Sequence, residues 1–171
     1  MVRPGRSGGR QSRGDRGMIK SRPQRREPKF RRILIAVDSG PIAAHAADTG
    51  VSLARELGGE VALVHAIDIA PAYGTEAGVS QDQLMAEARR EGKRLLVGFR
   101  EQLSLESSTL EFIVEGTPSE EIVKAARQWP ADVIVIGTRG LGSVQRALLG
   151  SVAEGVMRHA PCPVLVIRAT E

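Results

Sequence analysis

One connection in the sequence carries glycines where a bound phosphate would need bare main chain. It leaves a short apolar run and enters a helical pattern, and its small residues are Gly137, Gly140, Gly142, Gly150 and Ser151. Phosphate binding requires N–H groups that point at the ligand, and the start of a helix supplies such donors. Arg139 and Arg146 would add positive charge. The pattern predicts an anion site. The alternative it leaves open is that the glycines only form turns and that Ser151 only caps the helix together with Glu154.

Other reactive residue types do not form a catalytic pattern. No Ser/His/Asp or Cys/His arrangement is spaced for nucleophilic catalysis, and we expect no catalytic residues. Cys162 is the one cysteine, which excludes an internal disulfide and a site with several thiolates. It stands between two prolines, and we expect it to be buried. His65 falls in a predicted strand, so we expect its ring to pack in the core and only its main chain to take part in binding.

The elements that must position the glycine-rich connection alternate along the chain. Five apolar runs predict strands, at residues 33–38, 60–67, 110–114, 132–136 and 163–167. All but the third are continuous, as is typical of strands covered on both faces. Helical patterns fill the intervals between the runs. This alternation predicts an α/β fold with a parallel sheet and helices on both faces.

Several helix ends are marked by their residue types. Gly58 and Gly59 are expected to stop the first helix. Capping boxes are predicted at residues 80–83, 117–120 and 151–154, and the first of these opens a helix that runs to about Leu103. In the second box, proline follows the capping threonine and suits the first helical position.

Ligands of an open parallel sheet bind beyond the carboxyl ends of the strands, where the strand order reverses. The residues predicted at those ends include Asp38-Ser39-Gly40, Ala66-Ile67-Asp68, Glu115-Gly116 and the segment that begins at Gly137. These positions are the candidates for a binding site.

The spacing Gly137-x2-Gly140-x9-Gly150-Ser151 resembles the nucleotide-binding signature of the universal stress protein family. The segments ILIAVDSG, LVHAID, EGTPSEEIV and HAPCPVLVIR resemble the same family, and the match runs from about Phe30 to Arg168. The resemblance implies a five-stranded parallel sheet in the order 3-2-1-4-5 with four helices. Strands 1 and 4 would then be neighbours, which would bring Asp38 and the Gly137 segment to one ligand.

The ATP-binding branch of the family implies a role for each matching residue. Ribose and phosphates would be held by Gly137, Arg139, Gly140, Gly150, Ser151 and Val152. Asp38 and Ser39 would lie on the side of the adenine and ribose, and main-chain groups around His65 and Ala66 would read the adenine edge. Many members have Gly before Ser where this chain has Asp38-Ser39-Gly40. Mg²⁺ or Mn²⁺ would accompany the triphosphate of ATP, and Asp38 is the nearby acid, although no cluster of metal ligands stands out.

The charge is divided unevenly along the chain. Residues 1–32 carry 12 of the 24 Lys and Arg but two of the 20 Asp and Glu, so this stretch is +10 and the remainder is −6. We expect residues 1–29 to be a disordered basic tail and residues 30–171 to form the nucleotide-binding domain. The tail is interpreted either as an arm that contacts nucleic acid or acidic partners, or as a solvated extension with Met18 as the true start.

The resemblance implies a stress-related regulatory protein that binds ATP with slow or no hydrolysis, and the single cysteine and the composition predict a cytoplasmic protein. No run of the chain has the length of a membrane span.

The last strand is expected at an edge of the sheet, and the resemblance implies a homodimer through Val164–Ile167. Two alternatives are a dimeric interaction module of the same fold that binds no nucleotide and an adenylating ligase. The ligase would need a longer phosphate loop than the segment at residues 38–41 provides.

Overall fold

The computed structural model describes residues 30–69, 80–138 and 149–168. Along these residues strands and helices alternate without exception, as the pattern of apolar runs predicts. In chain order the elements are β1 (Arg32–Ala36), α1 (Ala43–Leu57), β2 (Glu60–Asp68), α2 (Gln81–Gln102), β3 (Leu110–Gly116), α3 (Pro118–Gln128), β4 (Val133–Gly137), α4 (Ser151–His159) and β5 (Val164–Ile167). The predicted tail of residues 1–29 lies outside the described residues, as do Arg139 and Gly140.

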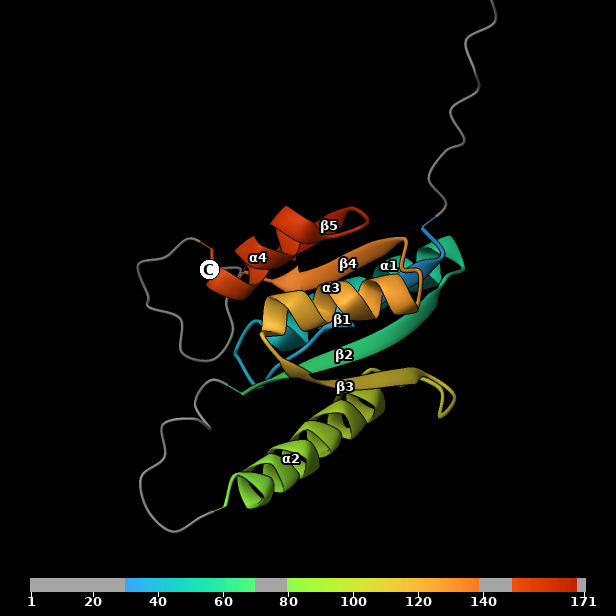
Figure 1. Cartoon of the computed structure of the whole chain (residues 1–171). Helices are drawn as coiled ribbons and strands as arrows, with labels where there is room; N and C mark the ends of the chain where they lie inside the picture. Colours follow the sequence, from blue (N-terminus) through green and yellow to red (C-terminus); the bar gives the residue numbers. More distant parts are fainter. Residues whose placement is uncertain (1–29, 70–79, 139–148, 169–171) are drawn as a thin grey trace, which may run out of the picture.

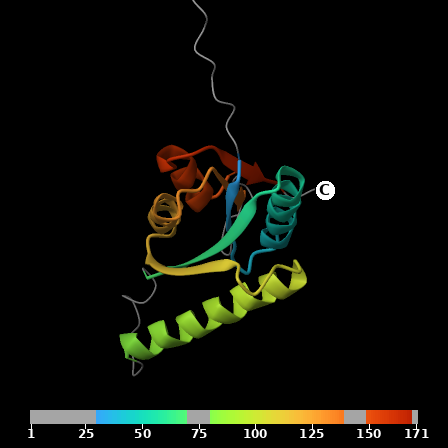
Figure 2. The same cartoon turned by 90° about the vertical axis from the view of Figure 1, so that its right-hand side faces the viewer.

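The five strands form one parallel sheet in the order β3-β2-β1-β4-β5. The expected fold class and strand order are therefore confirmed. Figures 1 and 2 show the helices on the two sides of this sheet, with α1 and α3 on opposite faces and α2 running along the β3 side. Because β1 and β4 are neighbours whose following connections lead to helices on opposite faces, their carboxyl ends mark the point where ligands bind in such sheets.

Two apolar layers hold the helices to the sheet. On one face Ile33 and Ile35 of β1 pack with α1 and with Leu96 and Phe99 of α2. On the other face Leu34 packs with α3 and α4. Successive side chains of β1 therefore enter different layers, which explains why its sequence is a continuous apolar run.

The prediction that four strands are covered on both faces is correct for β1 and β4 but wrong for β5. Every residue of β1 from Ile33 to Ala36 is buried, and so are four of the five residues of β4. β5 is an edge strand, which confirms the position expected for the last strand, and Leu165 on it is 36% exposed. A short apolar run has the same appearance in the sequence at an edge of the sheet as at its centre, because its residues alone do not specify which elements will pack against the strand.

Local signals predict most helix ends. Ser80 forms the expected capping box with Gln83, and Gly58 ends α1 at a φ of 60° in the left-handed region. Thr117 is the N-cap of α3 and is followed by proline, but its side chain makes no capping hydrogen bond, so the predicted box at residues 117–120 is wrong. The carbonyl of Thr117 accepts from Glu120 N at 3.0 Å instead.

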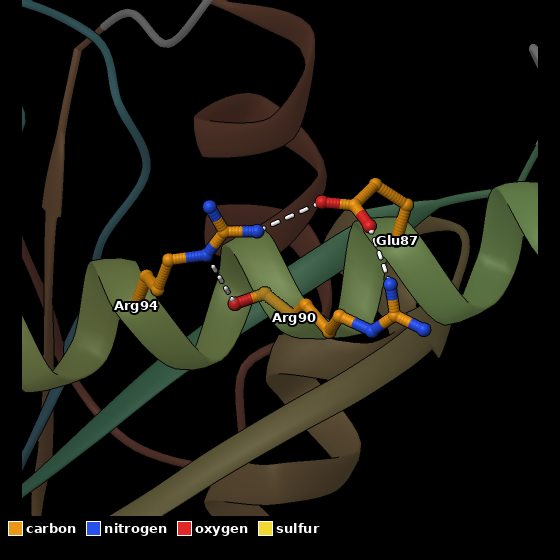
Figure 3. A network of polar contacts seen from close by, with 3 residues as sticks. All are labelled: Glu87, Arg90 and Arg94. Atoms are coloured by element: carbon orange, nitrogen blue, oxygen red, sulfur yellow. Dashed lines mark hydrogen bonds and ion pairs between the residues drawn. The ribbon is translucent and has the colours of Figure 1, made fainter.

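The outer side of α2 carries charged side chains that pair with one another. Glu87 accepts from Arg90 at 2.9 Å and from Arg94 at 2.8 Å, and Arg94 also donates to the Arg90 carbonyl (Figure 3). These side chains are about half exposed or more, so the pairs contribute little to stability. None of the described helices is long and apolar enough to cross a membrane.

Candidate functional site

A cavity of about 710 Å³ opens at the carboxyl end of the sheet. The ends of β1, β2 and β4 form its floor, and residues of α2, of α3 and of the start of α4 form its sides. Its volume lies within the usual range for small-molecule sites. Its polar and small lining residues include Asp38, Ser39, His65, Ala66, Asp68, Glu91, Gly92, Gly137, Thr138, Gly150, Ser151 and Val152.

The segment after β1 supplies one side of the cavity. Asp38 Oδ1 accepts a hydrogen bond from Gly40 N at 2.9 Å, so the carboxylate lies over its own turn. Ser39 is exposed and also lines the cavity. This local hydrogen bond fixes the Asp38 side chain beside the floor of the site.

The segment between β4 and α4 supplies a second part of the lining. Thr138 is 4% exposed, and its N–H donates to Ile167 O at 2.7 Å while its carbonyl accepts from Gly150 N at 2.6 Å. These main-chain bonds hold the start of α4 against the end of β4. The predicted box at residues 151–154 is wrong, because Gly150 is the N-cap and Ser151 is already the first helical residue. Glu154 instead pairs with Arg158 at 2.6 Å.

The start of α4 is suited to an anion. Glycine at the N-cap provides no side-chain acceptor, and helix geometry leaves the N–H groups of Ser151, Val152 and Ala153 without an acceptor inside the helix. The same end carries the positive part of the helix dipole. The alternative in which Ser151 serves only as a cap with Glu154 therefore does not describe this helix.

The end of β2 and the flank of α2 form the third part. The His65 ring lines the cavity and its Nδ1 lies 3.0 Å from Val37 O. The expectation that this ring packs in the core is correct in part: the ring contacts α2 at Gly92, but the residue is only half-buried. Ala88, Leu95 and Ile67 add apolar surface here. A flat, weakly polar ligand group would find both apolar contact and main-chain hydrogen bonds in this part.

An ion pair ties α2 to the neighbouring strand beside the cavity. Arg89 of α2 binds Glu115 of β3 through both carboxylate oxygens, with Arg89 Nη2 2.9 Å from Oε2. This hydrogen bonding lowers the pKa of Glu115 and raises the pKa of Arg89. Both groups are therefore charged around neutral pH, and the pair links α2 to β3 at an exposed position.

The acids at the site do not form a metal-binding cluster. Asp38, Asp68 and Glu91 all line the cavity. Within residues 30–69, 80–138 and 149–168, no group of three or more His, Cys, Asp or Glu side chains is arranged to hold a metal ion.

The structure gathers most of the predicted site residues. Eight of the ten line this one cavity: Asp38, Ser39, His65, Ala66, Gly137, Gly150, Ser151 and Val152. Sequence reasoning missed the contributions of Thr138, Glu91, Gly92 and Leu95. Thr138 stands inside the glycine-rich connection and could have been singled out there. The α2 residues carry no local signal, because only the packing of α2 on β2 brings them to the site.

Comparison with known proteins agrees with this geometry. The model of the universal stress protein family matches residues 29–168. The chain is 34% identical to universal stress protein MJ0531 of Methanocaldococcus jannaschii over 145 residues, which cover 83% of this chain and 84% of that protein. The solved structure of universal stress protein UspA from Lactobacillus plantarum has a TM-score of 0.70 at 26% identity, covering 82% of this chain and 99% of that one.

A further solved structure has the same fold at lower identity. It is a universal stress protein in complex with cAMP, with a TM-score of 0.63 at 21% identity, covering 83% of this chain and 99% of that one. The strand order and the family match agree, and the chain belongs to the universal stress protein family.

Proposed function

We propose that this chain is a regulatory protein that binds ATP, with slow or no hydrolysis, in the cavity between the carboxyl ends of β1 and β4. The observation that carries the proposal is that one cavity receives the end of β1, the end of β2 and the uncapped start of α4. An adenine nucleotide has an anionic end and a flat base, and the cavity offers a suitable surface for each. The cAMP complex of a related fold guides the choice of nucleotides to test first.

The phosphates are assigned to the start of α4 and to the glycine-rich connection. Gly137 and Gly150 expose main chain, and the N–H groups of Ser151 and Val152 lie in the first turn of α4. Arg139 and Gly140 are proposed to contribute as well, although they fall outside the described residues. Mg²⁺ would accompany the triphosphate, with Asp38 as the nearby acid.

The base and ribose are assigned to the other side. The main chain at His65 and Ala66 provides hydrogen-bonding groups, and Ala88 and Leu95 provide apolar contact for a ring. Asp38 and Ser39 lie between this region and α4, where a ribose would be placed. This arrangement puts the charged and the flat parts of the ligand at opposite ends of the cavity.

The sharpest test changes the first helical residue of α4. Proline fits this position in a helix, as Pro118 does in α3, and the extended Gly150 (ψ 154°) can precede a proline. Ser151→Pro removes the N–H, whereas Ser151→Ala removes the hydroxyl alone. We expect Ser151→Pro to weaken ATP binding about 10- to 100-fold in titration calorimetry, since a hydrogen bond to a charged group is lost. Ser151→Ala should lose much less.

Several outcomes would reject the proposal. Wild-type protein that releases no heat and shows no thermal shift at millimolar ATP, ADP, AMP or cAMP would favour the interaction module that binds no nucleotide. Unchanged binding by Ser151→Pro would reject the assignment of phosphate to α4. Phosphate release measured beside the titration decides how fast bound ATP is hydrolysed.

We also propose that the chain forms a homodimer through β5. This strand is at the edge of the sheet, its sequence is Val-Leu-Val-Ile, and Leu165 is exposed on it. An apolar edge strand is prone to pair with another chain. Light scattering should give a mass of twice 18.3 kDa. Leu165→Lys should reduce this mass to that of the monomer, while Leu57→Lys, at an exposed leucine of α1, should not.

A further inference from the structure

The β1–β2 ladder ends abruptly at the floor of the cavity. Its last paired residues are Ala36 and Val64, although β2 itself continues to Asp68 along β3. The N–H of Val37 still donates to Val64 O at 2.9 Å. If the ladder continued, the carbonyl of Val37 would accept from the N–H of Ala66. The structure shows a different donor for this carbonyl.

That donor is the imidazole ring of His65. Its Nδ1 lies 3.0 Å from Val37 O. A carbonyl oxygen can only accept, so Nδ1 must carry the proton. The side chain thus takes the place that the N–H of Ala66 would have in a longer ladder. Since alternate residues of β2 point their main-chain groups toward β1, the N–H of Ala66 is directed to the side where β1 has ended, and Ala66 lines the cavity there.

Helix α2 leaves room for the ring at one glycine. A Cβ atom built on Gly92 would lie 2.9 Å from His65 Cδ2, too close to be accommodated unless the ring moves. Glycine inside a helix costs about 1 kcal/mol relative to alanine, so its presence here calls for a packing reason. At Gly98, the second glycine of α2, a Cβ would meet nothing within 4 Å. The place of the ring therefore depends on Gly92 and not on glycine in α2 in general.

We propose that His65 is a positioning residue, whose side chain ends the β1–β2 ladder by binding Val37 O and thereby presents the main chain of Ala66 to the base of a bound nucleotide. The same bond fixes the peptide that precedes Asp38. This inference rests on the proposed function, since it assigns the base to this end of the cavity. From the sequence, only the main chain of His65 is expected to take part in binding, whereas this proposal assigns a function to its side chain.

Two substitutions separate the hydrogen bond from the packing. His65→Asn keeps an N–H donor near the place of Nδ1, and His65→Leu has a similar volume without a donor. We expect the ATP affinity of His65→Asn to lie within about threefold of wild type. We expect His65→Leu to bind ATP about tenfold more weakly, because it loses the hydrogen bond that positions the main chain. Inorganic tripolyphosphate has no base and serves as the control ligand. Its affinity should be equal in wild type and His65→Leu, whereas general loss of folding would weaken both ligands.

A second measurement needs no nucleotide. Long-range ¹H–¹⁵N spectra of the histidine rings, with the His65 signals assigned by their loss in His65→Asn, should show the Nδ1–H tautomer at neutral pH. An Nε2–H tautomer, or equal ATP affinity of wild type and His65→Leu, overturns the positioning role. Wild-type protein that binds tripolyphosphate but no adenine nucleotide overturns it as well. Failure of wild type to bind any of these ligands overturns the proposed function itself, and His65 then has no base to position.

Discussion

The two ends of the central strands β1 and β4 differ in what lies beside their main chain. At the amino end a single carboxylate oxygen, Asp132 Oδ2, accepts from Arg31 N at 2.9 Å and from Arg32 N at 2.8 Å. This carboxylate ties the segment before β4 to the start of β1, across about one hundred residues of sequence. At the carboxyl end the same two strands separate around a cavity of about 710 Å³.

The difference shows how a parallel sheet confines a binding site to one edge. Both strands present unpaired main-chain groups at both ends. At the amino end the carboxylate of Asp132 accepts hydrogen bonds from two of these groups, the N–H of Arg31 and the N–H of Arg32. At the carboxyl end glycine and the uncapped start of α4 leave N–H groups exposed, and the ring of His65 replaces a main-chain bond. The amino end therefore serves stability, and the carboxyl end is available for a ligand.

The largest expected effect tests the amino end. Asp132→Ala removes the acceptor of two main-chain N–H groups, and we expect a loss of about 2–3 kcal/mol in the free energy of unfolding, measured with urea. Asp132→Asn keeps an oxygen acceptor and should lose about half as much. Nucleotide affinity of the folded protein should stay unchanged in both variants. A weaker affinity without loss of stability would contradict the separation of the two ends.

A pair of glycine substitutions in α2 tests the carboxyl end with a smaller effect. Gly92→Ala places a methyl group against the His65 ring, and we expect a loss of about 1–2 kcal/mol in unfolding free energy together with weaker ATP binding. Gly98→Ala meets no atom and should stabilise the protein by about 0.5–1 kcal/mol through helix propensity alone. Equal behaviour of the two variants in thermal unfolding and titration would show that the contact with His65 is unimportant.

The smallest effect concerns the reactivity of Cys162, which lies just before β5 near the amino end. The expectation that Cys162 is buried is wrong in part, because the residue is half-buried. This partial burial raises the pKa of its thiol, and the negative charge of Asp132 raises it further. A raised pKa means less thiolate at pH 8 than an ordinary cysteine has, so alkylation by iodoacetamide should be several-fold slower than in the urea-unfolded chain and should rise steeply with pH. Mass spectrometry of the alkylated protein measures the rate. Asp132→Asn should speed the reaction slightly at pH 8, because the pKa of Cys162 then falls toward its ordinary value.

The sequence predicts well whatever depends on neighbours in the chain. The capping box at Ser80, the glycine stop at Gly58 and the alternation of strands and helices are all confirmed. The two other boxes are wrong for a local reason as well. Thr117 and Ser151 have suitable types and spacing, but the observed backbone leaves the Thr117 side chain uninvolved and places Ser151 one residue inside its helix.

The candidate site was predictable where it depends on the carboxyl ends of strands. Asp38, Ala66 and Gly137 directly follow or end apolar runs, and parallel strands bring such ends to one edge of a sheet. The wall of α2 was not predictable in the same way. Neither Gly92 nor Leu95 is near the other site residues in sequence, and only the packing of α2 against β2 brings them to the cavity.

The sequence by itself determined the kinds of elements, most of their ends and the residue types at the carboxyl edge, because helix and strand formation and glycine turns depend on residues only a few positions apart. Tertiary structure decided that His65 binds Val37 O, that Gly92 receives its ring and that Asp132 closes the opposite end. Each of these depends on chain segments far apart in sequence, whose distance and orientation are set only when the sheet and its two helical layers pack together.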